Sequence, residues 1–246
     1  MFDFMRVRAK RTVASWRFVN RQLGPSRLTN YLEHTTEPRI VIGSGTTHLQ
    51  GWCETEQEFL DLLKPVDWDE YFNPESITAL LAEHVWEHLT PEEGLRAAAV
   101  CYTYLKPGGY IRIAVPDGFH PDPFYISWIK VGGQSPGQHG NGHKVLYNYL
   151  TLGRIFQSAG FETRFYEYYD EHGHFCYADW DPKDGYIGRS SRYDKRNQEK
   201  LVFASIVMDA IKPKAQGAGD AEGDVLQLRQ RGRGAVLLPA VACVPS

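Results

Sequence analysis

The chain has 246 residues, of which 42% are hydrophobic, and these suffice for the core of one α/β domain with extensions. It contains no apolar run of 18 residues and no signal-peptide pattern at its N-terminus, which predicts a soluble, cytoplasmic protein. The four cysteines form no Cys-x-x-Cys pair, so we expect neither a disulfide framework nor a zinc knuckle. They are Cys53, Cys101, Cys176 and Cys243.

Charge is spread unevenly along the chain. Residues 1–27 hold seven basic side chains and one acid, and residues 213–246 hold four basic and three acidic side chains. Residues 28–212 therefore carry −10, by difference from the net charge of −3. An acidic body disfavours a nucleic-acid substrate, because contacts with phosphates supply most of the affinity for DNA and RNA.

The two ends of the chain differ in composition from the middle. Residues 1–38 predict a basic amphipathic helix and a linker, since apolar side chains share one helix face: Phe2, Met5, Ala9, Trp16, Val19 and Leu23. This face either docks on the acidic body of the protein, which we favour, or makes a peripheral contact with a membrane through residues 1–27. Residues 213–246 predict a disordered low-complexity tail. The folded domain is expected at residues 39–212.

The segment 39–48 is a short apolar run that leads into Gly-Ser-Gly. The run predicts a buried strand, and the glycines allow the backbone to turn sharply against a ligand. An ordinary tight turn is the alternative. An acid that ends the next strand is placed to bind ribose hydroxyls, and Glu56 is the candidate, with Glu54 close by. Either acid could also be a solvated loop residue.

A second buried strand is expected at residues 76–84, and polar side chains gather where it ends. Ligands bind at the carboxyl ends of parallel strands in open α/β sheets, so these side chains should lie at the functional edge. They are Glu83, His84, Glu87 and His88.

The next segments complete the expected order of elements. A capping box at Thr90-Pro-Glu-Glu93 predicts a helix over 91–105. Its buried stripe would comprise Leu95, Ala98, Ala99, Tyr102 and Leu105. The following segments predict a strand at 110–117 and strands at 161–169 and 200–211. Between them we expect a helix at about 148–159 that turns inward Leu152, Ile155, Phe156 and Ala159.

Residues 118–143 are rich in turn formers and also contain aromatic side chains and histidines, as expected of a lid or substrate loop. Further histidines raise the alternative of a metal site made from His139, His143, His172, His174 and Cys176. Their spacing matches metal sites only loosely, so we predict no metal ligands. Binding or deprotonation of an acceptor by His143, His172 or His174 is the simpler interpretation.

The motifs IGSG, GWCETE, LLAEHVWEHL and LKPGGYIRIAVPD occur in this order between residues 39 and 211. In this order they resemble class I S-adenosylmethionine-dependent methyltransferases, most closely the branch with EHxxEH after the fourth strand. The resemblance implies a Rossmann-like open sheet of about seven strands, with helices on both faces. That sheet is mostly parallel, and its antiparallel last strand lies between its two predecessors.

The resemblance also implies S-adenosylmethionine as the cofactor and a set of residues that bind it. The glycine loop of the family passes under the methionine portion, one acid holds the ribose, and another meets the adenine amino group. Carried to this chain, the loop is Gly43, Ser44 and Gly45, the ribose acid is Glu56, the adenine acid is Asp61 or Asp67, and Glu83 and His84 line the methionine side.

Two departures from the family pattern affect the functional prediction. Val41 stands where the family usually has an acid, and Thr47 where a third glycine is common. The absence of Asn-Pro-Pro-Tyr argues against methylation of DNA amino groups, and His48 breaks the dinucleotide fingerprint. Val41 motivates the alternative of a catalytically silent binding or scaffold protein. A metal-dependent enzyme that uses the histidine-rich loops is a second alternative.

The expected reaction is in-line displacement, in which an acceptor atom attacks the sulfonium methyl group. A general base is needed only if the acceptor carries a proton at neutral pH. Topology places four candidates for this role near the site: Asp117, His84, His88 and His143. Asp117 could instead cap a turn, and His88 could pack on the following helix. Aromatic, non-basic loops favour a small-molecule or glycan acceptor.

Overall fold

The computed structural model describes residue 19 and residues 22–45, 47–133, 142–197, 199–214 and 242–244. Most of the expected N-terminal helix, the middle of the expected lid and residues 215–241 of the expected tail lie outside this part. The two described members of the N-terminal apolar stripe, Val19 and Leu23, are 48% and 62% exposed. No helix among the described residues is long and apolar enough to cross a membrane.

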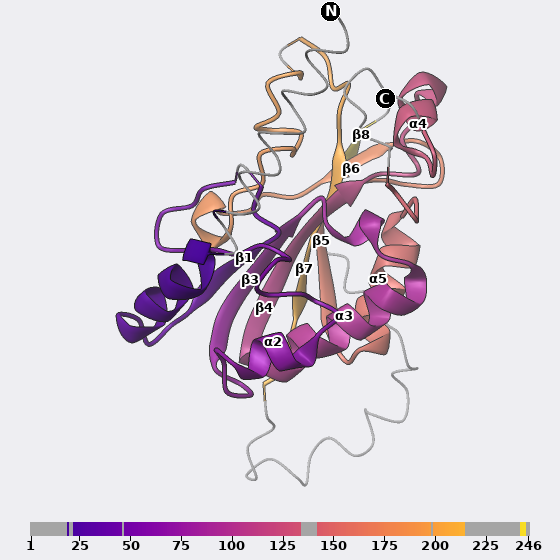
Figure 1. The fold of residues 1–246 in the computed structure, drawn as a ribbon. Coiled ribbons are helices and arrows are strands. Elements are labelled where there is room, and N and C mark those ends of the chain that lie inside the picture. Colours follow the sequence, from indigo (N-terminus) through magenta and orange to yellow (C-terminus); the bar gives the residue numbers. More distant parts are fainter. Residues whose placement is uncertain are drawn as a thin grey trace, which may run out of the picture.

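The centre of the fold is a single eight-stranded sheet with the order β2-β1-β3-β4-β7-β5-β6-β8 (Figure 1). Its strands are β1 (Arg39–Ile42), β2 (Cys53–Glu54), β3 (Ile77–Glu83), β4 (Leu105–Pro116), β5 (Glu162–Tyr169), β6 (Phe175–Tyr177), β7 (Ser205–Ile211) and β8 (Ala242–Val244). Strands β2, β1, β3 and β4 are parallel neighbours, whereas β7 lies antiparallel between β4 and β5. The predicted Rossmann-like α/β sheet with an antiparallel last strand is confirmed, and β6 and β8 extend it at one edge.

One face of the sheet is covered by helices (Figure 1). They are α2 (Pro65–Asp69), α3 (Pro91–Tyr104) and α5 (Tyr149–Ser158), and the helix at residues 22–33 adds Leu28 to the same core. The predicted capping box of α3 is present, since the Thr90 hydroxyl accepts from the Glu93 amide and the Glu93 carboxylate accepts from the Thr90 amide. Burial along one continuous apolar layer therefore fixes these helices on the sheet.

The buried stripe of α3 differs from the prediction by one position. Leu95 and Ala99 are exposed, whereas Gly94, Ala97 and Cys101 are buried. The cap at Thr90 sets where the helix begins, and the core then receives positions three and four residues apart from Gly94 onward. In α5, Leu152 and Phe156 are buried as predicted.

The opposite face of the sheet is not covered by long helices among the described residues, which corrects the expectation of helices on both faces. The segment 178–193, with only the short η2 (Pro182–Asp184), packs Trp180 and Ile187 on this face. The buried Arg112 side chain joins sheet and segment, because it binds Asp209 through two hydrogen bonds and donates to the Gly185 carbonyl. The connection 43–52 between β1 and β2 is too short for a crossover helix.

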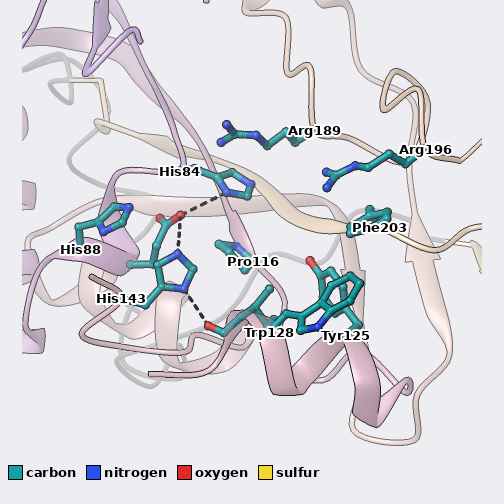
Figure 2. A pocket seen from close by; sticks show the side chains of 11 residues that line it. His84, His88, Pro116, Tyr125, Trp128, His143, Arg189, Arg196 and Phe203 are labelled. Atoms are coloured by element: carbon teal, nitrogen blue, oxygen red, sulfur yellow. Dashed lines mark hydrogen bonds and ion pairs between the residues drawn. The ribbon is translucent and has the colours of Figure 1, made fainter. Parts of the chain in front are cut away.

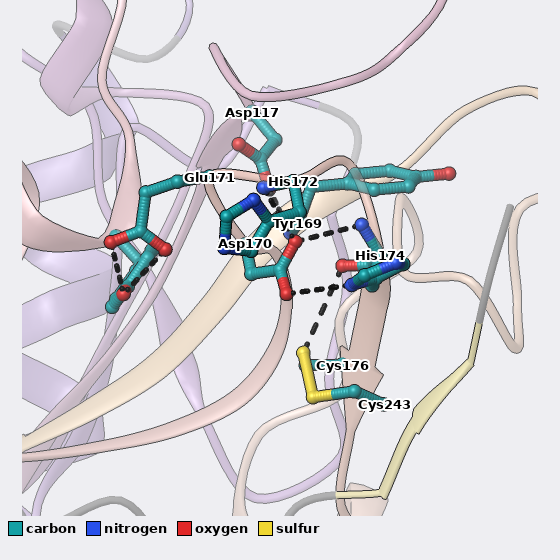
Figure 3. Close-up of a disulfide and its surroundings, with 9 residues drawn as sticks. Asp117, Tyr169, Asp170, Glu171, His172, His174, Cys176 and Cys243 are labelled. Atoms are coloured by element: carbon teal, nitrogen blue, oxygen red, sulfur yellow. Dashed lines mark hydrogen bonds and ion pairs between the residues drawn. A yellow bond between two sulfur atoms is a disulfide. The ribbon is translucent and has the colours of Figure 1, made fainter.

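The cysteines also differ from the prediction, because Cys176 and Cys243 form a disulfide (Figure 3). The two residues are 67 positions apart in sequence and become directly paired where β6 runs antiparallel to β8. Sequence spacing carries no signal of this pairing. Residues 242–244, which fall in the segment expected to be disordered, form the strand β8. Cys53 and Cys101 are free and buried.

Candidate active site

The glycine turn directly follows β1, as the sequence predicts. Gly43 and Gly45 have φ angles of +58° and +54°, a region that side chains other than glycine rarely adopt. Glu56 is bound back onto this turn, since its Oε1 accepts from the Ser44 hydroxyl at 2.6 Å and from the Gly45 amide at 2.8 Å. Burial raises the pKa of Glu56, and these two hydrogen bonds oppose the rise. The turn and its acid thus form one rigid unit.

The structure distinguishes Glu56 from the alternative ribose acid. Glu54 pairs with His48, whose Nδ1 lies 3.2 Å from the Glu54 carboxylate, and both are separate from the cavity beside the turn. Glu56 lines that cavity, and the described hydrogen bonds use only its Oε1. Its second oxygen remains for a ligand.

The cavity beside the turn has a volume of about 530 Å³. Gly43, Glu56 and Asp61 line it together with apolar residues around Leu60 and Val85. Asp61 accepts from the Leu63 amide and lies 3.3 Å from Lys64 Nζ. The other adenine candidate, Asp67, accepts from the Asp61 amide and stabilises the local turn instead. Of the two predicted acids, Asp61 is the one that lies at this cavity.

Glu83 and His84, predicted to act together, diverge at the end of β3. The Glu83 carboxylate accepts from the Arg189 amide at 2.7 Å and lines a separate hollow with Thr47 and Tyr186. His84 has a φ angle of +57° and lines the 530 Å³ cavity. A non-glycine residue in this strained region is common at functional sites. These two consecutive residues at the end of β3 therefore line different hollows.

A second cavity, of about 270 Å³, adjoins the first through His84 and His88, which line both (Figure 2). His143, which the sequence singled out, also lines this cavity. The remaining lining residues are Glu87, Pro116, Tyr125, Trp128, Ile129, Arg189, Arg196 and Phe203. Two neighbouring cavities with a shared wall can hold two reactants side by side.

Sequence reasoning missed several residues of the second cavity, and three of them belong to one segment. Arg189, Arg196 and Phe203 come from the irregular chain before β7, which has no periodic pattern. The Arg196 guanidinium lies 3.5 Å from the centre of the Phe203 ring and pairs with Asp194. The cluster of charged residues around position 190 was the only signal in the sequence, and by itself it did not separate a site from a solvated loop.

Asp117 does not reach either cavity, which argues against the predicted role as a base. Its side chain is fully buried, and its oxygens accept from the backbone amides of Phe119 at 2.9 Å and Tyr169 at 2.6 Å. Burial raises the pKa of Asp117 to about 7, although both amides favour the charged form. The alternative given by the sequence, that this acid stabilises a turn, fits the structure.

The remaining histidines do not form the metal site considered from the sequence (Figure 3). Cys176 is in the disulfide and has no thiolate to offer, and His174 Nδ1 lies 3.0 Å from Asp170. His172 belongs to the same turn, whereas His143 lies at the 270 Å³ cavity. His139 is outside the described residues.

No protein-family model matches the chain, and neither does any curated protein sequence. Solved structures resemble it at low identity. A SAM-dependent methyltransferase from Archaeoglobus fulgidus is 19% identical over 78% of this chain and 94% of that one, with a TM-score of 0.43. One from Thermotoga maritima is 13% identical over 83% and 96%, with a TM-score of 0.44. The phosphoethanolamine N-methyltransferase 2 of Haemonchus contortus, complexed with phosphomonomethylethanolamine and S-adenosylhomocysteine, is 14% identical over 78% and 53%, with a TM-score of 0.41.

Proposed function

We propose that this protein is an S-adenosylmethionine-dependent methyltransferase. The observation that carries the proposal is the unit formed by the Gly43–Gly45 turn and Glu56 beside a 530 Å³ cavity. The turn brings backbone close to a ligand, and the free oxygen of Glu56 can accept from ribose hydroxyls. Asp61, on the same wall, suits the adenine amino group. S-adenosylmethionine supplies the methyl group, which it carries on a sulfonium centre.

We assign the 270 Å³ cavity to the methyl acceptor. Tyr125, Trp128 and Phe203 offer aromatic surface, and Arg189 and Arg196 add positive charge. Aromatic faces with convergent polar groups are typical of sites for small molecules and sugars. The arginines favour an acceptor that carries acidic or hydroxyl groups. The net charge of −10 in residues 28–212 disfavours nucleic acid.

The chain's own residues have three tasks in this reaction. The walls of the two cavities align the acceptor with the methyl group, a contribution of about 7 kcal/mol or more in well-oriented systems. The apolar lining near Val85 and Ile129 excludes water from the charged sulfonium. A proton on the acceptor, where there is one, passes to a histidine at the shared wall, where His84 and His88 line both cavities.

Calorimetric titration of the purified full chain with S-adenosylmethionine tests the proposal, with NAD as the control ligand. We expect micromolar binding of S-adenosylmethionine and none of NAD. Gly43→Asp should weaken binding about 100-fold or more. The residue has a φ angle of +58°, which strains a side chain, the new Cβ would lie 3.1 Å from the Val85 side chain, and the new charge would lie at the cavity that Glu56 also lines. Glu56→Ala should have a similar effect.

Gly51→Asp is the matched control for the glycine variant. Gly51 also has a positive φ, of +81°, but a side chain there meets open space. The Gly51→Asp variant should bind S-adenosylmethionine with the affinity of the wild type. Circular dichroism and thermal melting verify that each variant is folded. A folded wild-type protein that binds no S-adenosylmethionine would refute the proposal and favour the alternative of a silent binding or scaffold protein.

A further inference from the structure

His88 and His143 are both fixed in one tautomer by backbone carbonyls. His143 Nδ1 lies 2.7 Å from the carbonyl of Ile129, and His88 Nδ1 lies 3.1 Å from the carbonyl of Gly142. Because a carbonyl only accepts, each Nδ1 must carry the hydrogen. The lone pair of each neutral ring is then on Nε2. Metal-binding histidines in proteins are oriented in this way by their second nitrogen.

These two rings lie beside a buried acid, Glu87, which is 1% exposed. Its Oε1 pairs with His84, whose Nδ1 lies at 3.2 Å, and His143 Nε2 lies 3.9 Å from the same oxygen (Figure 2). Neither oxygen has a well-aligned hydrogen bond from a described residue. A buried carboxylate that is satisfied so sparsely is costly, and native proteins pair such a group with a cation or bind a metal with it.

We propose that Glu87, His88 and His143 bind a divalent first-row transition metal ion at the shared wall of the two cavities. One ligand atom from each residue lies within 4.8 Å of the other two, which is close enough to surround one ion. Two imidazoles and one carboxylate form a donor set that suits Zn²⁺, Fe²⁺ or Mn²⁺ better than Mg²⁺ or Ca²⁺. Three protein ligands leave coordination positions open.

The open positions face the acceptor cavity, because Glu87, His88 and His143 all line it. This role of the metal rests on the proposed function. An acceptor hydroxyl bound to the ion would lose its proton more readily, as metal-bound water does, and His84, which is not one of the three ligands, would take it. The oxygen then forms a bond to the methyl carbon, and the carbon–sulfur bond breaks with its electron pair left on sulfur. The site would select acceptors with a hydroxyl group beside a second oxygen or an acid, which can chelate the ion.

Metal titration of the full chain, after removal of bound ions with a chelator, tests the site without any methyl acceptor. We expect one Zn²⁺ per chain by calorimetry and one Co²⁺ with visible absorption of a nitrogen- and oxygen-ligated ion. His88→Ala should weaken Zn²⁺ binding about 10- to 100-fold. His88 is exposed, so this variant keeps its core. His172→Ala, an equally exposed histidine on another turn, should bind as the wild type does.

Glu87→Gln adds a second test, because it keeps the volume of the buried side chain and removes its charge. It should also lose Zn²⁺ binding and the Co²⁺ absorption. Equal binding by the wild type, His88→Ala and Glu87→Gln would overturn the site, as would binding of Mg²⁺ alone. Gly43→Asp should keep full metal binding, so failure of the methyltransferase proposal and failure of the metal site give different results.

Discussion

Glu56 and Glu87 are two buried carboxylates on the lining of adjoining cavities, and they differ in how the protein treats their oxygens. Glu56 Oε1 receives two hydrogen bonds from the glycine turn within 2.8 Å. Glu87 Oε1 lies instead 3.2 Å from His84 Nδ1 and 3.9 Å from His143 Nε2. One acid is held by the backbone of a turn, and the other lies among histidine side chains.

The difference indicates what each region requires of its ligand. A carboxylate held by backbone donors is already oriented, so a ligand meets a preformed surface at low cost in entropy. A buried carboxylate beside the Nε2 lone pairs of two histidines favours a cation between them. We therefore expect the turn around Glu56 to respond to the cofactor and the cluster around Glu87 to respond to metal ions.

The prediction with the largest expected effect concerns a third buried carboxylate, Asp117, and the pH dependence of stability that it causes. It is fully buried with two backbone donors, and its pKa is raised by burial to about 7. The folded protein therefore keeps a proton that the unfolded chain loses above pH ~4, so the free energy of unfolding falls as the pH rises from about 4 to about 7. A shift of this size corresponds to a loss of about 4 kcal/mol.

Urea unfolding of the wild type and Asp117→Asn across this pH range measures the effect. The wild type should lose stability with rising pH, and the difference between the two proteins should shrink toward pH 7, since Asn carries no titrating group. Asp122→Asn is the control, because Asp122 also accepts from a backbone amide but is only partly buried. A pH dependence in Asp117→Asn as steep as in the wild type would show that another group causes it.

The second prediction tests whether each ligand depends on a different one of the two acids, Glu56 and Glu87. Zn²⁺ at about 100 times its dissociation constant should raise the free energy of unfolding of the wild type by about 2.7 kcal/mol. Glu56→Gln should keep this stabilisation by Zn²⁺ and lose that by S-adenosylmethionine, whereas Glu87→Gln should do the reverse. The measurement is thermal melting of both variants with each ligand.

One outcome of this melting experiment would contradict the prediction. If both variants lose stabilisation by both ligands, the two carboxylates belong to one site and the comparison between them fails. Glu54→Gln serves as the matched control, because Glu54 pairs with the exposed His48 and lines neither cavity. It should respond to both ligands as the wild type does.

The sequence predicts the glycine turn and Glu56 because every signal for them is local. The apolar run 39–42, the glycines at 43 and 45 and the acid at 56 lie within one short stretch, and the geometry they need is set by backbone torsions. The central sheet follows from the same kind of information. Buried strands are visible in the sequence as apolar runs, and helix ends as a capping box or a glycine at a fixed position.

The acceptor cavity could not be predicted in this way, because it is assembled from distant segments. Its lining comes from residues 84–88, 116, 125–129, 143, 189, 196 and 203, which the sheet brings together with β7 between β4 and β5. The sequence singled out His84, His88 and His143 separately, but it assigned no metal ligand and gave Glu87 no task. The burial of Glu87 and the hydrogen bonds of the two histidines decide the chemistry, and none of these has a sequence period.

Ser44→Ala gives the smallest expected effect and tests whether the orientation of Glu56, rather than its mere presence, matters for binding. The Ser44 hydroxyl donates to Glu56 Oε1 at 2.6 Å in a buried position, and a hydrogen bond to a charged group contributes about 1.5–3 kcal/mol. The Gly45 amide still donates to the same oxygen in the variant, so the loss should lie near the lower end of that range. Affinity for S-adenosylmethionine should then fall about 10-fold, with unchanged affinity for Zn²⁺.

Ser76→Ala, which removes a hydroxyl that donates to the Asn73 carbonyl outside both cavities, should leave both affinities unchanged. A full affinity for S-adenosylmethionine in Ser44→Ala would mean that the backbone amide alone orients Glu56, and the preformed character of this region would then depend on the glycine turn alone.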